Sequence, residues 1–196
     1  MVVPFFDLVR QYESIRAEIE DAVGRVLASG RFILGPEVEA FEGELAARCG
    51  VDHAVGVASG TDALLLSLQA LGIGAGDRVL VPTLTFFATA GAVARVGATP
   101  AFADIDAETF NLDAEQVRAI LDEDRARSIR AILPVHLFGR MVAMDEMVAL
   151  ADAHGAIVIE DAAQAVGARR GEHLAGTVGH VGCFSFFPTK NLAAYR

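Results

Sequence analysis

From residue 52 onward, short apolar runs alternate with segments of helical periodicity, and this alternation restricts the fold more than any other feature of the chain. Most of the runs are apolar at every position rather than at every second one, which is typical of parallel strands covered by helices on both faces. We therefore predict an α/β fold with a mostly parallel, open sheet flanked by helices. The predicted strands are 53–58, 78–82, 99–103, 129–134, 156–160 and 181–187, and the predicted helices between them are 61–71, 86–96, 113–121 and 142–154.

Residues 1–50 lack this alternation and are predicted to be helical. Apolar residues recur at helical spacing over 12–27 and again over 37–48, and the glycines at 30, 35 and 50 interrupt the pattern. We expect two parts, an N-terminal helical segment over residues 1–50 and an α/β domain over residues 51–196.

The composition argues against several classes of protein. Of the 196 residues 53% are hydrophobic, which is enough to build a core, and the net charge of −10 argues against binding to nucleic acid. No apolar run approaches the ~18 residues that span a bilayer, and Asp7 and Arg10 stand where a signal peptide would be apolar. We expect a cytoplasmic protein that does not contact membranes. Cys49 and Cys183 fit no metal-ligand spacing and are interpreted as reduced thiols, so no metal site is predicted.

Lysine is almost missing from the chain. Of its 16 basic residues 15 are arginine, and Lys190 is the one lysine. The two residue types exchange easily as solvated charges, but a guanidinium forms no imine with a carbonyl, whereas an amine does. On its own, a solvated charge is the commoner explanation of a lysine. The surroundings of Lys190 therefore decide how it is interpreted.

Polar residues gather where the predicted strands end, which is where open α/β sheets bind ligands. Ser59-Gly60-Thr61-Asp62 opens a helix after the first strand. Its amides, glycine and hydroxyls suit an anion, although an ordinary N-cap explains the same residues. Phe86 and Phe87 begin the next helix, and either one ring faces a flat ligand while the other is buried, or both rings pack in the core.

Two more strand ends carry candidate residues. Asp161 ends an apolar run and is followed by Ala162-Ala163-Gln164. Its carboxylate needs a cationic or N–H partner, and the sequence also resembles a capping box, so it is predicted to cap a helix, which is compatible with the first role. Ser185 is the one polar residue of the run 181–187, and is either a core hydroxyl or a second phosphate donor. Lys190 follows this run, beside the other strand ends.

Each of these residues has a plain structural explanation, but the set as a whole matches the needs of pyridoxal 5'-phosphate (PLP). The phosphate of PLP needs N–H and hydroxyl donors, and its ring needs a stacking partner. The pyridine nitrogen needs an acid, and the aldehyde needs a lysine. The sequence therefore predicts a PLP site at the carboxyl edge of the sheet.

Nearly the whole chain resembles the DegT/DnrJ-type sugar aminotransferases, which are PLP enzymes of fold type I. The resemblance rests on the combined order of several segments, none of which is specific alone. They are Phe32-Ile33-Leu34-Gly35-Pro36-Glu37-Val38, Ser59-Gly60-Thr61-Asp62-Ala63-Leu64, Thr85-Phe86-Phe87-Ala88-Thr89, Pro100-Ala101-Phe102-Ala103-Asp104-Ile105-Asp106, Pro134-Val135-His136-Leu137-Phe138-Gly139, Ile159-Glu160-Asp161-Ala162-Ala163-Gln164-Ala165 and Phe184-Ser185-Phe186-Phe187-Pro188-Thr189-Lys190-Asn191-Leu192.

The resemblance implies a role for each candidate residue. Lys190 would bind the aldehyde of PLP and then move the proton between donor and acceptor carbons. Asp161 would pair with the pyridine nitrogen, Gln164 would hydrogen-bond the phenolic oxygen, and Phe86 would stack on the ring. His136 lies in a recurrent family motif, and the resemblance assigns it no role. The residues implied to hold the phosphate are Gly60, Thr61 and Ser185.

The resemblance also implies a reaction, in which an amino group moves from glutamate to a keto group on a nucleotide-linked sugar. A related branch of the family uses the fold for dehydration and has histidine at the position of Lys190, so the lysine favours transamination. Family members are homodimers about twice this length, and residues beyond 196 would complete the large domain and form a smaller C-terminal domain. There are two alternatives. One is a PLP-dependent sugar dehydratase, and the other is an inactive truncated remnant that only binds cofactor or a partner.

Overall fold

The computed structural model of the chain describes residues 7–192 and 194. Internal contacts divide it into two units, of which the first ends at Gly56 and the second begins at Val57. Within the described residues, no helix is both long enough and apolar enough to span a bilayer.

Two helices form most of the first unit, as predicted. The first, α1 (Leu8–Ser29), ends at Gly30, whose φ of 65° lies in the left-handed region that favours glycine. The second, α2 (Pro36–Cys49), begins with a proline. Proline suits the first helical turn because it lacks the backbone N–H, which at that position would have no acceptor within the helix. It ends at Gly50, which has a φ of 68°.

The strand predicted over residues 53–58 is wrong, because this segment has no strand as a partner. Instead, the N–H of Gly56 donates a hydrogen bond of 2.6 Å to the Glu42 carboxylate of the same unit. Val55 is 79% exposed, so its apolar side chain is not part of the core. Apolar composition favours a strand, but only a ladder of backbone hydrogen bonds makes one.

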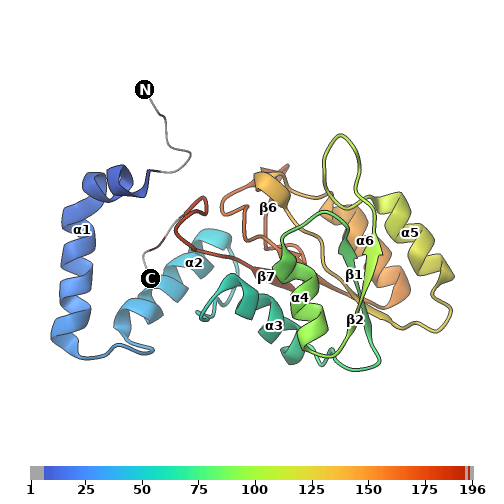
Figure 1. Ribbon diagram of the computed structural model, residues 1–196, viewed down its shortest axis with the longest axis horizontal. Helices are drawn as coiled ribbons and strands as arrows, with labels where there is room; N and C mark the ends of the chain where they lie inside the picture. The colour runs from blue at the N-terminus through green and yellow to red at the C-terminus, as the bar shows by residue number, and fades with distance from the viewer. Residues whose placement is uncertain (1–6, 193, 195–196) are drawn as a thin grey trace. The chain divides into compact units, whose positions relative to one another are not determined.

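The second unit contains a five-stranded sheet in the order β2-β1-β3-β4-β7, in which every pairing is parallel (Figure 1). The predicted α/β class is therefore confirmed. Two strands are shorter than predicted. The strand predicted over 129–134 ends at Ile132, and the strand predicted over 181–187 ends at Cys183. The strands are β1 (Arg78–Pro82), β2 (Thr99–Ala103), β3 (Ile129–Ile132), β4 (Ile157–Asp161) and β7 (Val181–Cys183).

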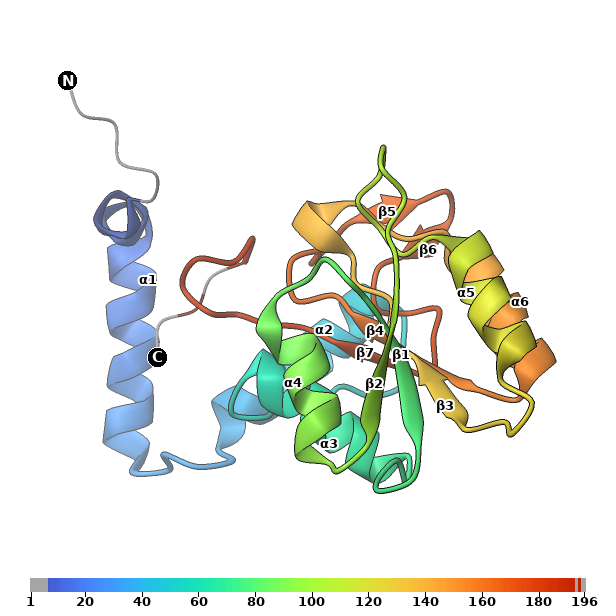
Figure 2. The same ribbon diagram turned by 45° about the vertical axis from the view of Figure 1, so that its right-hand side comes forward.

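Helices cover both faces of this sheet (Figure 2). On one face, α3 (Gly60–Ala70) and α4 (Phe87–Arg95) pack on side chains such as Val79. On the other, α5 (Ala114–Glu123) and α6 (Met144–His154) pack on side chains such as Leu80. Neighbouring residues of one strand are thus buried in different layers, which is why the strands are apolar at successive positions.

Two short elements near the carboxyl edge were not predicted. A small antiparallel hairpin consists of β5 (Arg169–Arg170) and β6 (His173–Leu174). A 3-10 turn, η1 (Leu137–Gly139), contains Phe138 with a φ of 54°. A non-glycine residue in this left-handed region is uncommon and is held there by its surroundings.

Asp124, at the end of α5, joins β3 and α6 at the opposite edge of the sheet. Its buried carboxylate accepts hydrogen bonds from Ile129 N–H and from the Ser128 hydroxyl, each at 2.7 Å, and lies 3.1 Å from Nε2 of His154. Burial alone would raise the pKa of Asp124, but these hydrogen bonds outweigh burial and lower the pKa to about 2.

We therefore expect Asp124 to make the fold sensitive to acid. Unfolding restores the ordinary pKa of about 3.9, so the unfolded chain takes up a proton that the folded chain does not bind. The free energy of unfolding should fall as the pH drops from about 4 to about 2, and more steeply in the wild type than in Asp124→Asn. Urea unfolding at several pH values measures this, and equal slopes in the two proteins would contradict it.

Candidate active site

The parallel topology brings together the residues that follow β4 and β7 and those that begin α3 and α4. The sequence-predicted candidates all lie on these segments of the second unit. Their positions follow from the direction of the strands, since the carboxyl ends of parallel strands meet at one edge of the sheet.

The amino end of α3 presents free backbone donors. Ser59 is its N-cap, and its Oγ accepts from Asp62 N–H at 3.1 Å and donates to the Asp62 carboxylate at 2.8 Å. The N–H groups of Gly60 and Thr61 belong to the first turn and have no acceptor within the helix. The predicted N-cap is thus confirmed, and it leaves two amides that suit an anion.

Gly60 allows Ser185 to approach this helix end. A Cβ at position 60 would lie 2.8 Å from the Cβ of Ser185 and 3.2 Å from its Oγ. Ser185 is buried, and its Oγ accepts a long hydrogen bond of 3.4 Å from Phe187 N–H. The absence of a side chain at position 60 therefore brings a hydroxyl beside the free amides of α3.

Gly60→Ala should damage this contact. The backbone of Gly60 accommodates alanine, so the effect comes from the clash with Ser185 and from Phe184 O, which would lie 3.2 Å from the new methyl group. We expect a loss of about 1–3 kcal/mol in the free energy of unfolding, measured by urea denaturation, and a weaker affinity for PLP. Gly43→Ala, on α2 with nothing within 4 Å of its new Cβ, is the matched control and should not destabilise the chain. Equal stabilities of the two variants would refute the close approach.

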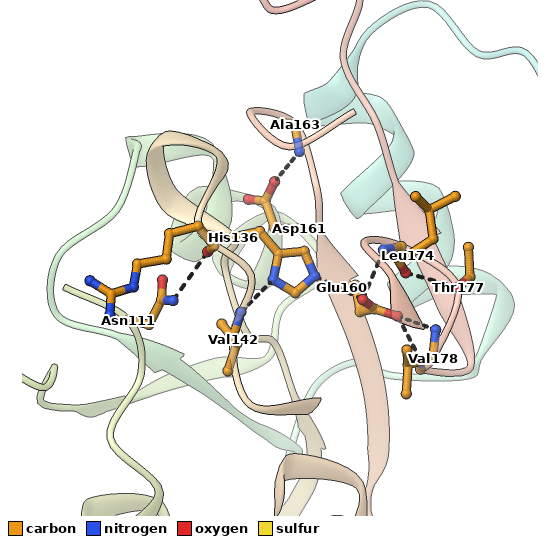
Figure 3. Close-up of polar contacts among 12 residues, drawn as sticks. Asn111, His136, Val142, Glu160, Asp161, Ala163, Leu174, Thr177 and Val178 are labelled. Carbon is orange, nitrogen blue, oxygen red and sulfur yellow. Dashed lines mark hydrogen bonds and ion pairs between the residues drawn. The ribbon is translucent and has the colours of Figure 1, made fainter. Parts of the chain in front are cut away.

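Asp161, at the end of β4, is 5% exposed and has two hydrogen-bond donors, of which Figure 3 shows Ala163. The Thr89 hydroxyl donates to Oδ2 at 2.9 Å, and Ala163 N–H donates to Oδ1 at 3.2 Å. Burial raises the pKa of Asp161, whereas both hydrogen bonds and the positive charge of Lys190 act in the opposite direction. The additional prediction that Asp161 caps a helix is wrong, because residues 162–168 contain two turns and no helix.

Gln164 lies on the first of these turns. Its Oε1 accepts a hydrogen bond of 2.9 Å from Phe138 N–H, on the η1 turn. Because the carbonyl end of the amide is occupied in this way, the NH2 end is the part that is left to donate to a ligand.

Phe86 and Lys190 approach one another at the same edge. The Lys190 Nζ lies 5.9 Å from the centroid of the Phe86 ring, within the range of a cation–π contact. Lys190 is half-buried, and its charge acts on Asp161. The side chains of Phe86 and Phe87 are 65% and 83% exposed. The prediction that one ring is buried and the alternative that both pack in the core are therefore both wrong.

Three further side chains at this edge were missed or left without a role. Thr89 is fully buried on α4 and links Asp161 to the hydroxyl of Thr85, 2.8 Å from its own. Glu160 and His136 are also fully buried, and 2.8 Å separates their side chains. A charged residue inside an otherwise apolar strand was the available signal for Glu160, because such a group needs several donors.

Known proteins share both the sequence and this fold. Residues 13–195 match the DegT/DnrJ/EryC1/StrS aminotransferase family. The UDP-N-acetyl-3-dehydro-alpha-D-glucosamine 3-aminotransferase of Acidithiobacillus ferrooxidans is 47% identical over 192 residues, which cover 98% of this chain and 51% of that protein. The chain thus spans about half the length of the curated relatives it matches.

Two solved structures extend the comparison to the backbone. Streptomyces venezuelae DesV, in complex with a ketimine intermediate, is 49% identical with a TM-score of 0.93, and the match covers 98% of this chain and 51% of that one. Bacillus subtilis NtdA, with the bound cofactor PMP, is 32% identical with a TM-score of 0.89 over 98% of this chain and 43% of that one. The chain therefore belongs to the DegT/DnrJ/EryC1/StrS aminotransferase family.

Proposed function

We propose that this chain is the PLP-binding part of an aminotransferase that moves an amino group from glutamate to a keto group on a nucleotide-linked sugar. The observation that carries the proposal is the meeting of the one lysine with an exposed aromatic ring, 5.9 Å away, beside a buried aspartate. Family membership supports the cofactor, and the relative from Acidithiobacillus ferrooxidans, named for a UDP-linked amino sugar, supports the substrate class.

The residues present fit PLP in their chemistry. The first amides of α3, at Gly60 and Thr61, together with the Ser185 hydroxyl, would hold the phosphate. The Phe86 ring is exposed and therefore free to stack on a flat ligand. The NH2 group of Gln164 would donate to the phenolic oxygen, because its own carbonyl is held by Phe138.

Asp161 would act as the acid partner of the ring nitrogen. A carboxylate with two donors already in place has a fixed orientation, and the donors counteract the effect of burial on its pKa. It would keep a proton on the ring nitrogen, so that the bound PLP supplies an electron sink for the charge that develops beside the transferred nitrogen.

Lys190 would carry out the proton movements. Its amine is half-buried and lies 5.9 Å from the centroid of the Phe86 ring, which would stack on the cofactor. One amine would thus attach the cofactor, remove a proton from the donor and return a proton to the acceptor, which are the tasks of a general acid and base.

The organisation of the whole protein follows from the same proposal. Residues 51–196 would form the PLP-binding part of a large domain, preceded by the helical segment 1–50. The active protein would be a cytoplasmic homodimer without nucleic-acid or membrane partners. A sugar dehydratase would need no lysine at position 190, and an inactive remnant would need no donor set around Asp161, so we favour the aminotransferase.

A simple experiment tests the proposal. The purified chain is mixed with PLP and treated with borohydride, and its peptides are mapped by mass spectrometry; we expect a stable addition on Lys190. Adding glutamate before borohydride should abolish the addition and release 2-oxoglutarate. A folded chain that acquires no addition would overturn the PLP site, and an addition that glutamate leaves unchanged would overturn transamination by this chain.

A further inference from the structure

Glu160 lies next to Asp161 on β4 but points into the opposite layer of the unit, because successive side chains of a strand alternate. It is fully buried and accepts hydrogen bonds from two directions (Figure 3). On one side its Oε2 lies 2.8 Å from Nε2 of His136. On the other its carboxylate meets the N–H groups of Gly176, Val178 and Gly179 at 2.8, 2.7 and 2.6 Å.

The protonation of the His136 ring is set by its other nitrogen. Nδ1 accepts a hydrogen bond of 3.2 Å from Val142 N–H, so the ring proton lies on Nε2 and points at Glu160. Glu160 therefore accepts four hydrogen bonds, two at each oxygen, and an ionised carboxylate has the lone pairs to accept all four. Burial alone would raise the pKa of Glu160, but the bonds from His136, Gly179 and Gly176 outweigh it and lower the pKa.

His136 also touches the backbone of the candidate site. The backbone N–H of His136 donates to the carbonyl oxygen of Asp161 at 3.0 Å, and the backbone N–H of Asp161 donates to Pro134 O at 2.9 Å. These bonds extend the pairing of β3 and β4 beyond the last residue of β3. The side chain of His136 thus anchors the same segment whose backbone supports Asp161.

The η1 turn follows His136 directly and carries the donor that orients Gln164. Phe138 has a φ of 54° and Gly139 a φ of 83°, and the N–H of Phe138 reaches Gln164 Oε1 at 2.9 Å. A strained turn keeps this form only while neighbouring contacts hold it. The turn lies between His136 and Val142, and the His136 ring links these two residues because its Nδ1 accepts from Val142 N–H. The other ring nitrogen, Nε2, bonds to Glu160.

We propose that His136 and Glu160 are positioning residues, whose buried hydrogen bond holds the η1 turn so that the Phe138 N–H aims the Gln164 amide at the cofactor. The same carboxylate holds residues 176–179, which precede β7 and the segment that carries Ser185. The inference rests on the proposed function only for the identity of the ligand, since the hydrogen bonds belong to the chain itself.

Two variants and a matched control test the pair. His136→Phe removes the donor to Glu160 and the acceptor of Val142 N–H, while His136→Gln keeps a side-chain donor. His154→Phe is the control, because His154 makes a similar buried contact of 3.1 Å with Asp124, at the opposite edge of the sheet. Any general loss of stability should appear in His154→Phe as well as in His136→Phe.

The first measurement uses the chain without PLP. Amide hydrogen exchange followed by NMR should become about tenfold faster at Phe138 and at Val178 in His136→Phe, less so in His136→Gln, and unchanged there in His154→Phe. Unchanged exchange at Phe138 in a folded His136→Phe or His136→Gln chain would overturn the positioning role, whether or not the chain binds PLP.

The second measurement uses the chain with bound PLP and follows its visible circular dichroism, which reports the orientation of the ring. His136→Phe and Gln164→Leu should change this spectrum in the same way, and the double variant should match Gln164→Leu alone, because His136 acts through Gln164. Additive changes would overturn that route. A wild-type chain that binds no PLP would instead overturn the proposed function, and the exchange measurement would still decide the positioning role.

Discussion

Lys190→Arg should abolish borohydride-stable attachment of PLP and reduce any transfer rate by at least about 10²–10⁴-fold, the usual contribution of a general acid or base. The substitution keeps the positive charge, and a guanidinium over the Phe86 ring keeps the cation–π contact that Lys190 makes at 5.9 Å. What it removes is the ability to give up a proton and to form an imine. The loss therefore separates the chemistry of the amine from its charge.

The scarcity of lysine makes the control for this experiment unusually clean. Arg170→Lys, on the exposed strand β5, introduces a second lysine on an element that carries none of the candidate residues. Mass mapping after borohydride should find the addition at Lys190 in this variant and none at position 170. An equal addition at both positions would mean that PLP reacts with any exposed amine. Attachment that persists in Lys190→Arg would remove Lys190 from the mechanism.

The sheet could be predicted from the sequence because its strands are buried on both faces. Val79 and Leu80 are neighbours that pack into different layers, so the run is apolar throughout, and each such run corresponds to one strand of the parallel sheet. The segment 53–58 has the same apolar character, yet it forms no strand. Its composition does not reveal whether a partner exists, because the partner of a strand comes from elsewhere in the chain.

The site could be predicted only in part, for a related reason. Asp161 and Lys190 were found because each stands out at the end of an apolar run, and the topology then brings the strand ends together. Thr89 and Glu160 act through contacts with residues that are distant in the sequence, at separations of 72 residues to Asp161 and 24 residues to His136. The left-handed φ of Phe138 leaves no trace in composition either, because a phenylalanine does not prefer it.

Asp161→Ala should have the second largest effect, which falls on proton transfer rather than on attachment. The amine of Lys190 is untouched, so borohydride should still fix PLP to the chain. Without an acid partner for the ring nitrogen, the conversion of bound PLP by glutamate should slow by about 10²–10³-fold, which is the scale of losing one preorganised electrostatic contact. Single-turnover absorbance measurements with glutamate give this rate. A rate equal to that of the wild type would refute the role of Asp161.

The same variant should not lower the stability of the chain, and this distinguishes a functional group from a structural one. Burial raises the pKa of Asp161, so at neutral pH the folded state carries a free-energy cost for this group that the unfolded chain, with the ordinary pKa, does not carry. Removing a group whose folded pKa is raised removes that cost, and Thr89 retains its 2.8 Å contact with Thr85. Thr89→Val, which deletes a donor to Asp161, should raise the pKa further and give a smaller loss of rate that grows as the pH falls. If Asp161→Ala instead unfolds at lower urea than the wild type at pH 7, the carboxylate serves the fold, and its place beside Lys190 no longer argues for catalysis.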